Sequence, residues 1–185
     1  MRHRFLAITS LAFVVVATIA MTFGTATDAA PAGQKVTIPI PQSLQVEHRA
    51  IHEELEAAIK APGRTGAAAR EVAAVLGPHF KREDEIALPP LGLLAPLARG
   101  ERPAGMSEAL AMSDALRKEL PHMLEEHKQI RAATETLLAA AREEKATAPE
   151  QFARDLLLHA QSEEEVLYPA AVLVGDIIRA RTGPK

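Results

Sequence analysis

The sequence predicts an all-α protein, an antiparallel up-down-up-down four-helix bundle preceded by an N-terminal signal or anchor segment. The strongest helix formers, above all Ala, Leu and Glu, dominate the 185 residues, and aromatic residues make up only 3%. Apolar residues recur at helical spacing in long stretches that proline-rich and glycine-rich segments separate. We find no stretch with a strong strand pattern.

Composition also narrows the functional classes. The formal net charge is −3, without the basic excess that nucleic-acid binding requires, so we expect no nucleic-acid partner. The chain contains no cysteine. This excludes disulfide scaffolds, zinc ribbons, iron–sulfur clusters and thiol catalysis.

Residues 1–29 are predicted to be a signal peptide or an N-terminal membrane anchor. Four residues that include two arginines precede an uncharged run from Phe5 to Thr27, and small residues follow. This order is typical of a cleaved secretory signal, but the run is also long enough to span a bilayer uncut. Either form predicts a secreted, periplasmic or other extracytoplasmic protein, which contacts a membrane only if the segment is uncleaved. Residues 30–41 are predicted to be an extended linker, because their spaced prolines oppose a helix.

The helical domain is predicted to cover residues 42–181. Its first helix should run from residue 42 or 43 to about residue 60, where Ala61-Pro62-Gly63 stops it. The second should begin near Thr65, a candidate N-cap, and end before Pro89-Pro90, with a kink at Gly77-Pro78. Residues 89–105 are predicted to be a long connection with one short helical turn, packed on the core through its leucines.

The other two helices complete the predicted bundle. The third should start between Ser107 and Asp114 and reach about Lys145, with Pro121 kinking or breaking it. The fourth should start after Pro149 and continue to about residue 181, with a kink at Pro169. Short connections between long helices favour antiparallel neighbours.

Two segments carry the same histidine–glutamate pattern. His159 and Glu163 are four residues apart, as are His79 and Glu83, and this spacing places both side chains on one helix face. In each segment a second acid, a further glutamate and a proline follow in the same order. The pattern is common by chance in one helix, so its repetition is what makes it informative.

The first and third helices repeat a shorter motif, Glu-His, at His48 and His127. These two histidines are 79 residues apart, and His79 and His159 are 80 apart, which predicts an internal duplication. Folded about a pseudo-two-fold axis, the two helix pairs would bring four histidines and two glutamates together in the core. Buried histidines and carboxylates are costly unless they are paired or bound to metal, so we favour a metal centre over surface groups.

Imidazole and carboxylate ligands suit iron, manganese, zinc or copper and disfavour magnesium and calcium. Six or seven converging ligands imply two metal ions, with Glu83 and Glu163 as bridges and the histidines on either side. Ferritin-like centres use Glu-x-x-His with additional glutamates, and they match this pattern less well.

These motifs together resemble the hemerythrin-like HHE cation-binding domain over about residues 42–172, with Asp84 in place of the second glutamate of the second helix. The resemblance implies a non-haem di-iron centre in an up-down-up-down bundle. Its cofactor would be two iron ions, with manganese or zinc as alternatives. It implies metal ligands at His48, His79, Glu83, His127, His159 and Glu163.

His52 is a seventh candidate ligand, because it follows His48 by four residues. It would complete the five histidines and two carboxylates of the oxygen-binding hemerythrins, although their paired His-x-x-x-His lies on the third helix, where this chain has Arg131. His122 is left out, because it precedes His127 by five residues. Acids next to the ligands, such as Asp84 and Glu164, are assigned to supporting or surface positions. Six other glutamates are assigned to a solvated face: Glu47, Glu53, Glu54, Glu125, Glu143 and Glu144.

The expected function is that of an exported di-iron protein that binds or senses oxygen or nitric oxide, or handles iron. Such a small diatomic molecule would be its partner, and no oligomeric state is predicted. A metal-binding protein is favoured over a dedicated enzyme, since no substrate pocket or proton-delivery group is evident. The alternatives are a metal-stapled structural or iron-storage bundle and a di-iron oxidase or peroxidase.

Overall fold

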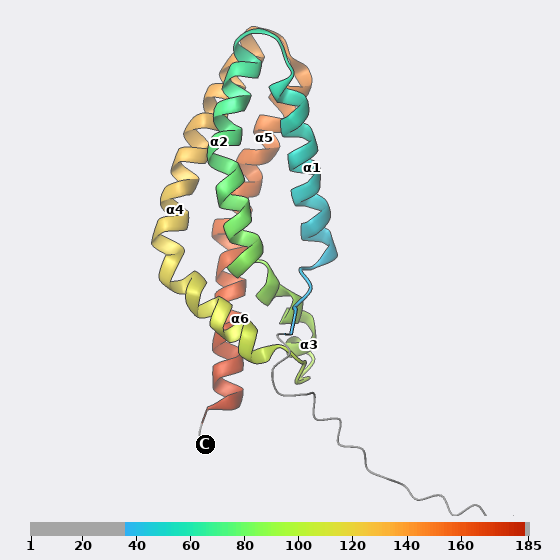
Figure 1. The fold of residues 1–185 in the computed structure, drawn as a ribbon, viewed down its shortest axis with the longest axis vertical. Coiled ribbons are helices and arrows are strands. Elements are labelled where there is room, and N and C mark those ends of the chain that lie inside the picture. Colours follow the sequence, from blue (N-terminus) through green and yellow to red (C-terminus); the bar gives the residue numbers. More distant parts are fainter. Residues whose placement is uncertain (1–35, 184–185) are drawn as a thin grey trace, which may run out of the picture. The chain divides into compact units, whose positions relative to one another are not determined.

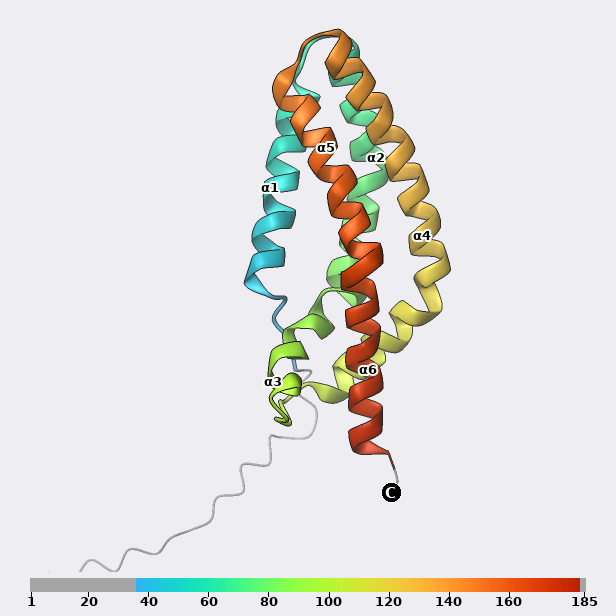
Figure 2. The ribbon, with the colours of Figure 1, turned by 180° about the vertical axis from the view of Figure 1, so that it is seen from behind.

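The computed structural model describes residues 36–183, so the predicted signal or anchor segment and the start of the predicted linker lie outside it. Four long helical segments lie side by side and alternate in direction (Figures 1 and 2). They are α1 (Gln42–Ile59), α2 (Gly63–Ile86), α4 (Met106–Glu143), and a continuous segment made of α5 (Thr147–Ser162), the π-helical turn η2 (Glu163–Leu167) and α6 (Tyr168–Thr182). Residues 36–183 contain no strand, so the all-α prediction is confirmed and the bundle agrees with it. Within the same range, no helix has both the length and the apolarity to cross a bilayer.

Two apolar clusters fill the interior of the long helices. The first contains Ile51 of α1 and Ile130 of α4, and the second contains Met123 of α4 with Leu44 packed against it. His48 lies between Leu44 and Ile51 in the chain, and His127 lies between Met123 and Ile130. The histidines therefore occupy a polar layer between two apolar layers, where water has little access.

Helix boundaries differ from the predictions at several prolines and caps. Helix α2 begins at Gly63, two residues before Thr65, and α4 begins at Met106, one residue before the predicted window. Pro78 and Pro121 both lie inside their helices, so of the two alternatives predicted at Pro121, a kink or a break, the break does not occur. Helix α4 changes direction partway along its length instead (Figure 1). A proline removes one backbone hydrogen bond, and packing along a long helix can absorb that loss.

The connection after α2 is more helical than predicted. It forms a 3₁₀ turn, η1 (Pro89–Leu93), and the short helix α3 (Leu94–Ala98). Leu91, Leu93 and Leu97 are buried, which confirms that the connection packs on the core. Residues 36–41 form no helix, and Ile38 is buried in a third cluster with Leu93 and Leu97.

Glu144, assigned to solvent from the sequence, caps the N-terminus of α2. Its Oε1 accepts a hydrogen bond from the backbone N–H of Arg64 at 2.8 Å, and its Oε2 accepts from the N–H and hydroxyl of Thr65 at 3.0 and 2.6 Å. These bonds satisfy amides that have no partner within the helix. The hydroxyl of Thr65, then the two amides, lower the pKa of Glu144.

Substituting Glu144 with alanine should lower the melting temperature by a few degrees, because α2 loses its cap, and should leave metal content unchanged. The depressed pKa means that the stabilisation is present above about pH 4.5 and is lost as pH falls below it. Thermal unfolding at pH 7 and pH 4 tests both statements. Glu143→Ala is the matched control, since among residues 36–183 Glu143 pairs only with the exposed side chain of Arg64. Equal melting temperatures for the two variants would contradict the capping role.

Candidate metal centre

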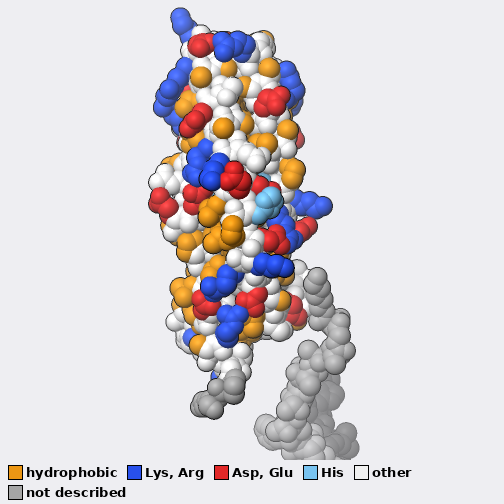
Figure 3. Space-filling view, turned by 90° about the vertical axis from the view of Figure 1, so that its left-hand side faces the viewer, with side chains coloured by type: hydrophobic (Ala, Val, Ile, Leu, Met, Phe, Trp, Pro, Cys, Tyr) orange, Lys and Arg blue, Asp and Glu red, His pale blue; other side chains and the backbone are white. Residues whose placement is uncertain are grey.

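The structure brings six of the seven predicted ligand residues into one buried cluster. Lysine, arginine and acidic side chains are interspersed over the bundle face in Figure 3, where they meet solvent. Glu83 and Glu163 are exceptions, with only 0% and 1% of their surface exposed. The cluster lies in the polar layer of the bundle and consists of His48, His79, Glu83, His127, His159 and Glu163.

The donor atoms form two groups that share one carboxylate. His79, Glu83, His127 and Glu163 make the first group, and His48, His159 and Glu163 make the second. In the first group, the Nε2 atoms of His79 and His127 lie 2.8 Å apart. In each group, the donor atoms all lie within 4.8 Å of one another. That separation suits the ligands of one metal ion per group.

Each carboxylate directs one oxygen toward each histidine pair. Oε1 of Glu83 lies 3.4 Å from Nε2 of His79, and Oε2 lies 3.8 Å from Nε2 of His48. Oε2 of Glu163 lies 3.4 Å from Nε2 of His127, and Oε1 lies 2.9 Å from Nε2 of His159. A carboxylate placed in this way can bridge two ions.

Four buried atoms of the cluster have no hydrogen-bond partner within the described residues: Nε2 of His48, Oε2 of Glu83, Nε2 of His159 and Oε1 of Glu163. Nε2 of His159 and Oε1 of Glu163 lie close together, but they are not oriented for a hydrogen bond. Leaving a buried polar group unpaired costs about 1–3 kcal/mol. All four are metal-donor atoms that face the interior of the cluster, so the residues present fit bound cations.

Carboxylates from neighbouring helices hold the outer nitrogens of three histidines. Nδ1 of His79 lies 2.8 Å from Glu126, and Nδ1 of His127 lies 2.8 Å from Glu164. Nδ1 of His159 lies 3.1 Å from Glu47, which is exposed as predicted and also contacts this ring. Such partners fix the tautomer and leave Nε2 free to bind metal.

His48 is held differently. Its Nδ1 lies 3.8 Å from Asp84, beyond hydrogen-bond distance, and its ring stacks on Phe80 with centroids 4.2 Å apart. His48 also lines a pocket of about 330 Å³ together with Arg49 and His52. The second donor group is therefore the one next to a surface pocket.

The electrostatics of the metal-free cluster favour the protonated forms of His79 and His159. Burial alone would lower the pKa of His159, but Glu163 and then Glu47 outweigh it and raise the pKa to about 9. His79 follows the same pattern, because Glu83 and Glu126 outweigh burial and raise its pKa.

The pKa values of the two cluster carboxylates are shifted in opposite directions. Burial and then the charge of Glu163 raise the pKa of Glu83. Burial would also raise the pKa of Glu163, but the adjacent imidazoles of His127, His159 and His48 hold it well below 4.5. A cation that binds the metal-free cluster must therefore displace protons from its ligands.

His52 lies outside both donor groups, so the structure does not bring it into the centre. It is exposed, and its ring lies nearly perpendicular to that of Phe80, which stacks on His48. His122 is also exposed, with Nε2 3.2 Å from Oε1 of Glu126.

Sequence reasoning missed Tyr168. Its hydroxyl donates to Oε1 of Glu83 at 2.5 Å and lies 3.1 and 3.0 Å from Nε2 of His79 and His127. Tyr168 is five residues after Glu163, which in a regular α-helix turns it well away from the ligand face. The π-helical turn η2 removes that rotation, and the backbone N–H of Tyr168 bonds to the carbonyl of Glu163.

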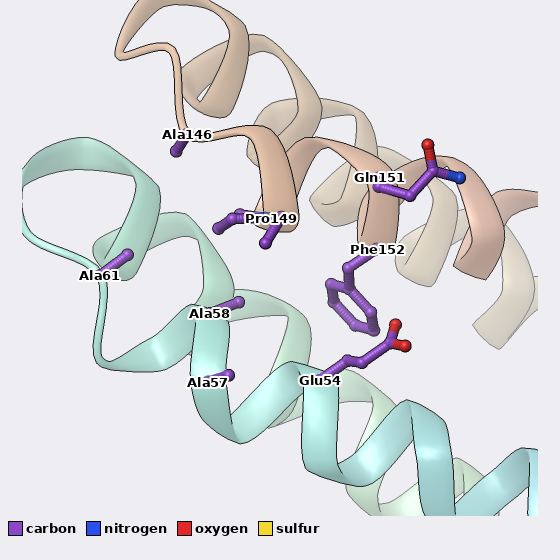
Figure 4. A pocket seen from close by; sticks show the side chains of 9 residues that line it. Glu54, Ala57, Ala58, Ala61, Ala146, Pro149, Gln151 and Phe152 are labelled. Atoms are coloured by element: carbon purple, nitrogen blue, oxygen red, sulfur yellow. The ribbon is translucent and has the colours of Figure 1, made fainter.

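A separate apolar pocket of about 420 Å³ lies between the end of α1 and the start of α5 (Figure 4). Alanines, Pro149 and Phe152 line it, and Glu54 is its one ionisable side chain. The pocket includes none of the six cluster residues. The pocket is therefore separate from the histidine cluster.

A helical bundle with four histidines and two glutamates converging in its core defines a class of metal-binding proteins. The family model of the hemerythrin HHE cation binding domain matches residues 40–171. The chain therefore belongs to the hemerythrin HHE cation-binding family, which confirms the predicted resemblance. Neither the curated proteins nor the solved structures include a significant match.

Proposed function

We propose that the protein binds two iron ions in this cluster and uses them to bind or sense a small diatomic molecule such as oxygen or nitric oxide. The observation that carries the proposal is the set of four buried donor atoms without hydrogen-bond partners, shared between two groups. A mixed imidazole and carboxylate set suits iron, with manganese or zinc as alternatives.

His79, Glu83, His127 and Glu163 would hold one ion, and His48, His159 and Glu163 the other. The carboxylates behind three of the histidines keep those rings oriented, and the apolar layers on either side exclude water. Bound iron would supply reversible binding of a diatomic ligand at an open coordination position. The second group has fewer protein donors and lies beside the pocket at His48, which supports ligand binding there.

The proposal includes export, which the basic start and apolar run of residues 1–29 support. Membrane attachment would follow only if that segment is uncleaved. A metal-stapled or iron-storage bundle and an oxidase or peroxidase are the competing functions.

The test is anaerobic loading with ferrous iron, followed by metal analysis and absorption spectra before and after adding oxygen or nitric oxide. We expect two irons per chain and a new visible absorption band with at least one of the two gases. Two irons without a spectral change on adding either gas would favour a structural or storage role. Rapid consumption of added peroxide would favour an oxidase or peroxidase. One zinc, or no metal after loading, would contradict the proposal.

A further inference from the structure

Tyr168 is the chain's single tyrosine and is completely buried, with 0% of its surface exposed. Its hydroxyl lies within 3.1 Å of one donor atom of each of His79, His127 and Glu83. All three belong to the first donor group. The phenol therefore ends inside the set of atoms that would surround one metal ion.

The spacing of three of these atoms matches that expected for adjacent ligands of one metal ion. Nε2 of His79, Nε2 of His127 and the hydroxyl oxygen of Tyr168 form a triangle with edges of 2.8, 3.1 and 3.0 Å. Adjacent ligands of an octahedral ion are about 3.0 Å apart when each metal–ligand bond is about 2.1 Å. Three donors that lie on one face of an octahedron have this arrangement.

A π-turn in the backbone places the phenol there. Pro169 has no N–H, so it cannot make the helical bond to the carbonyl of Glu165, and the chain widens into the π-turn η2 just before it. The turn brings Tyr168 onto the same side as Glu163. π-turns inside α-helices are frequently found at functional sites.

The other histidine–glutamate segment provides an internal comparison. Leu88 stands nine residues after His79, as Tyr168 stands nine residues after His159, and a proline follows both. The backbone N–H of Leu88 also bonds to the carbonyl of Glu83, five residues earlier. Leu88 is buried but carries no donor atom. A phenol therefore enters the cluster from one segment only, which makes the two metal positions unequal.

We propose that the oxygen of Tyr168 is a ligand of the iron held by His79, Glu83, His127 and Glu163. This inference rests on the proposed iron site. On binding, the phenol O–H bond breaks, its electron pair forms the bond to iron, and the proton leaves to solvent, with no change in oxidation state. Phenolate is an established protein ligand of iron. With this position filled by the protein, the diatomic ligand is directed to the iron at His48 and His159.

The competing role for the hydroxyl is a hydrogen bond to Glu83 with the proton retained. Ferric protein without oxygen or nitric oxide distinguishes the two roles. Iron-bound phenolate gives a broad visible charge-transfer band, and resonance Raman spectra excited in it show tyrosine ring vibrations. The chain has no cysteine and one tyrosine, so no thiolate or second phenol can contribute.

We expect ferric wild-type protein to show this band, with ring vibrations that shift when ring-deuterated tyrosine is incorporated. Tyr168→Phe should lose the band and release about one proton fewer per chain on metal binding, measured by calorimetry in buffers of different ionisation enthalpy. Ser113→Ala is the matched control, because it removes a buried hydroxyl that bonds to the α6 carbonyl of Ala171 and should keep the band.

Wild-type protein that binds two irons but shows no tyrosine vibrations would overturn the ligand role of Tyr168 and leave the iron site intact. A band that persists in folded Tyr168→Phe would overturn it too. Wild-type protein that binds no iron would instead overturn the proposed function. The wild-type spectrum decides the question even if the variant fails to fold.

Discussion

Substituting Glu163 with alanine should abolish binding of both metal ions. Glu163 is the one side chain that belongs to both donor groups, and its two oxygens lie near His127, His159 and His48. Loss of a carboxylate that only supports a ligand costs about 10–100-fold in metal affinity. Loss of this shared ligand should cost more than about 100-fold for each ion.

Iron content after equal loading and dialysis measures the effect, with circular dichroism as the check on folding. Glu163→Gln keeps the shape of the side chain if the alanine variant is unstable, and it should also lose metal because the bridging charge is gone. Glu165→Ala is the matched control on the same helical segment, since Glu165 is exposed and, within the part of the chain that the structure describes, accepts only from Gln161. Two irons retained in both Glu163 variants would show that the cluster is not the metal site.

The metal-free protein should lose stability as pH rises from about 6.5 to 9. His159 has a pKa of about 9 in the folded chain against 6.5 when unperturbed. A raised histidine pKa contributes stability that is fully present below about pH 6.5 and disappears as pH rises through 9. The loss is at most on the order of 3 kcal/mol, and the raised pKa of His79 acts in the same direction.

Urea unfolding of metal-free protein at pH 6.5 and 9.5 measures this loss, and His159→Gln should reduce it. Metal affinity should change in the opposite sense, because each proton that a cation displaces makes binding about tenfold tighter per pH unit. A redox-inert ion such as zinc gives that measurement without oxidation. Metal-free protein that is equally stable at both pH values would contradict the raised pKa of His159.

The six cluster residues could be predicted because their spacing follows the period of an α-helix. His79 with Glu83 and His159 with Glu163 are one helical turn apart, and each places a histidine and a carboxylate on one face. The internal duplication remains a prediction from the spacing of these motifs.

His52 shows where the same reasoning failed. Its four-residue spacing from His48 places both residues on one helix face, but not every residue on that face reaches the cluster. Phe80, on a different helix, contacts both rings, and His52 remains exposed at the surface. Helical spacing describes one helix at a time and cannot show what a second helix inserts beside it.

Supporting acids were predicted in part. The sequence predicts a supporting or surface position for Glu164, because it follows Glu163 directly. In the structure Glu164 contacts His127. Glu126 and Glu47 precede histidines in the two Glu-His pairs, and they contact His79 and His159 across helix interfaces. The repeated pair was the available signal, but each glutamate supports a histidine on another helix.

The sequence by itself determined the helical class, the polar layer of histidines and glutamates, and the family, because composition and helical periodicity are local properties of the chain. Only the tertiary structure decided that Glu83 and Glu163 each face both histidine pairs and that His52 stays outside. It also decided that Tyr168 enters the cluster through a π-turn. Each of these depends on where one helix meets another, or on a local departure from 3.6 residues per turn, and periodicity specifies neither.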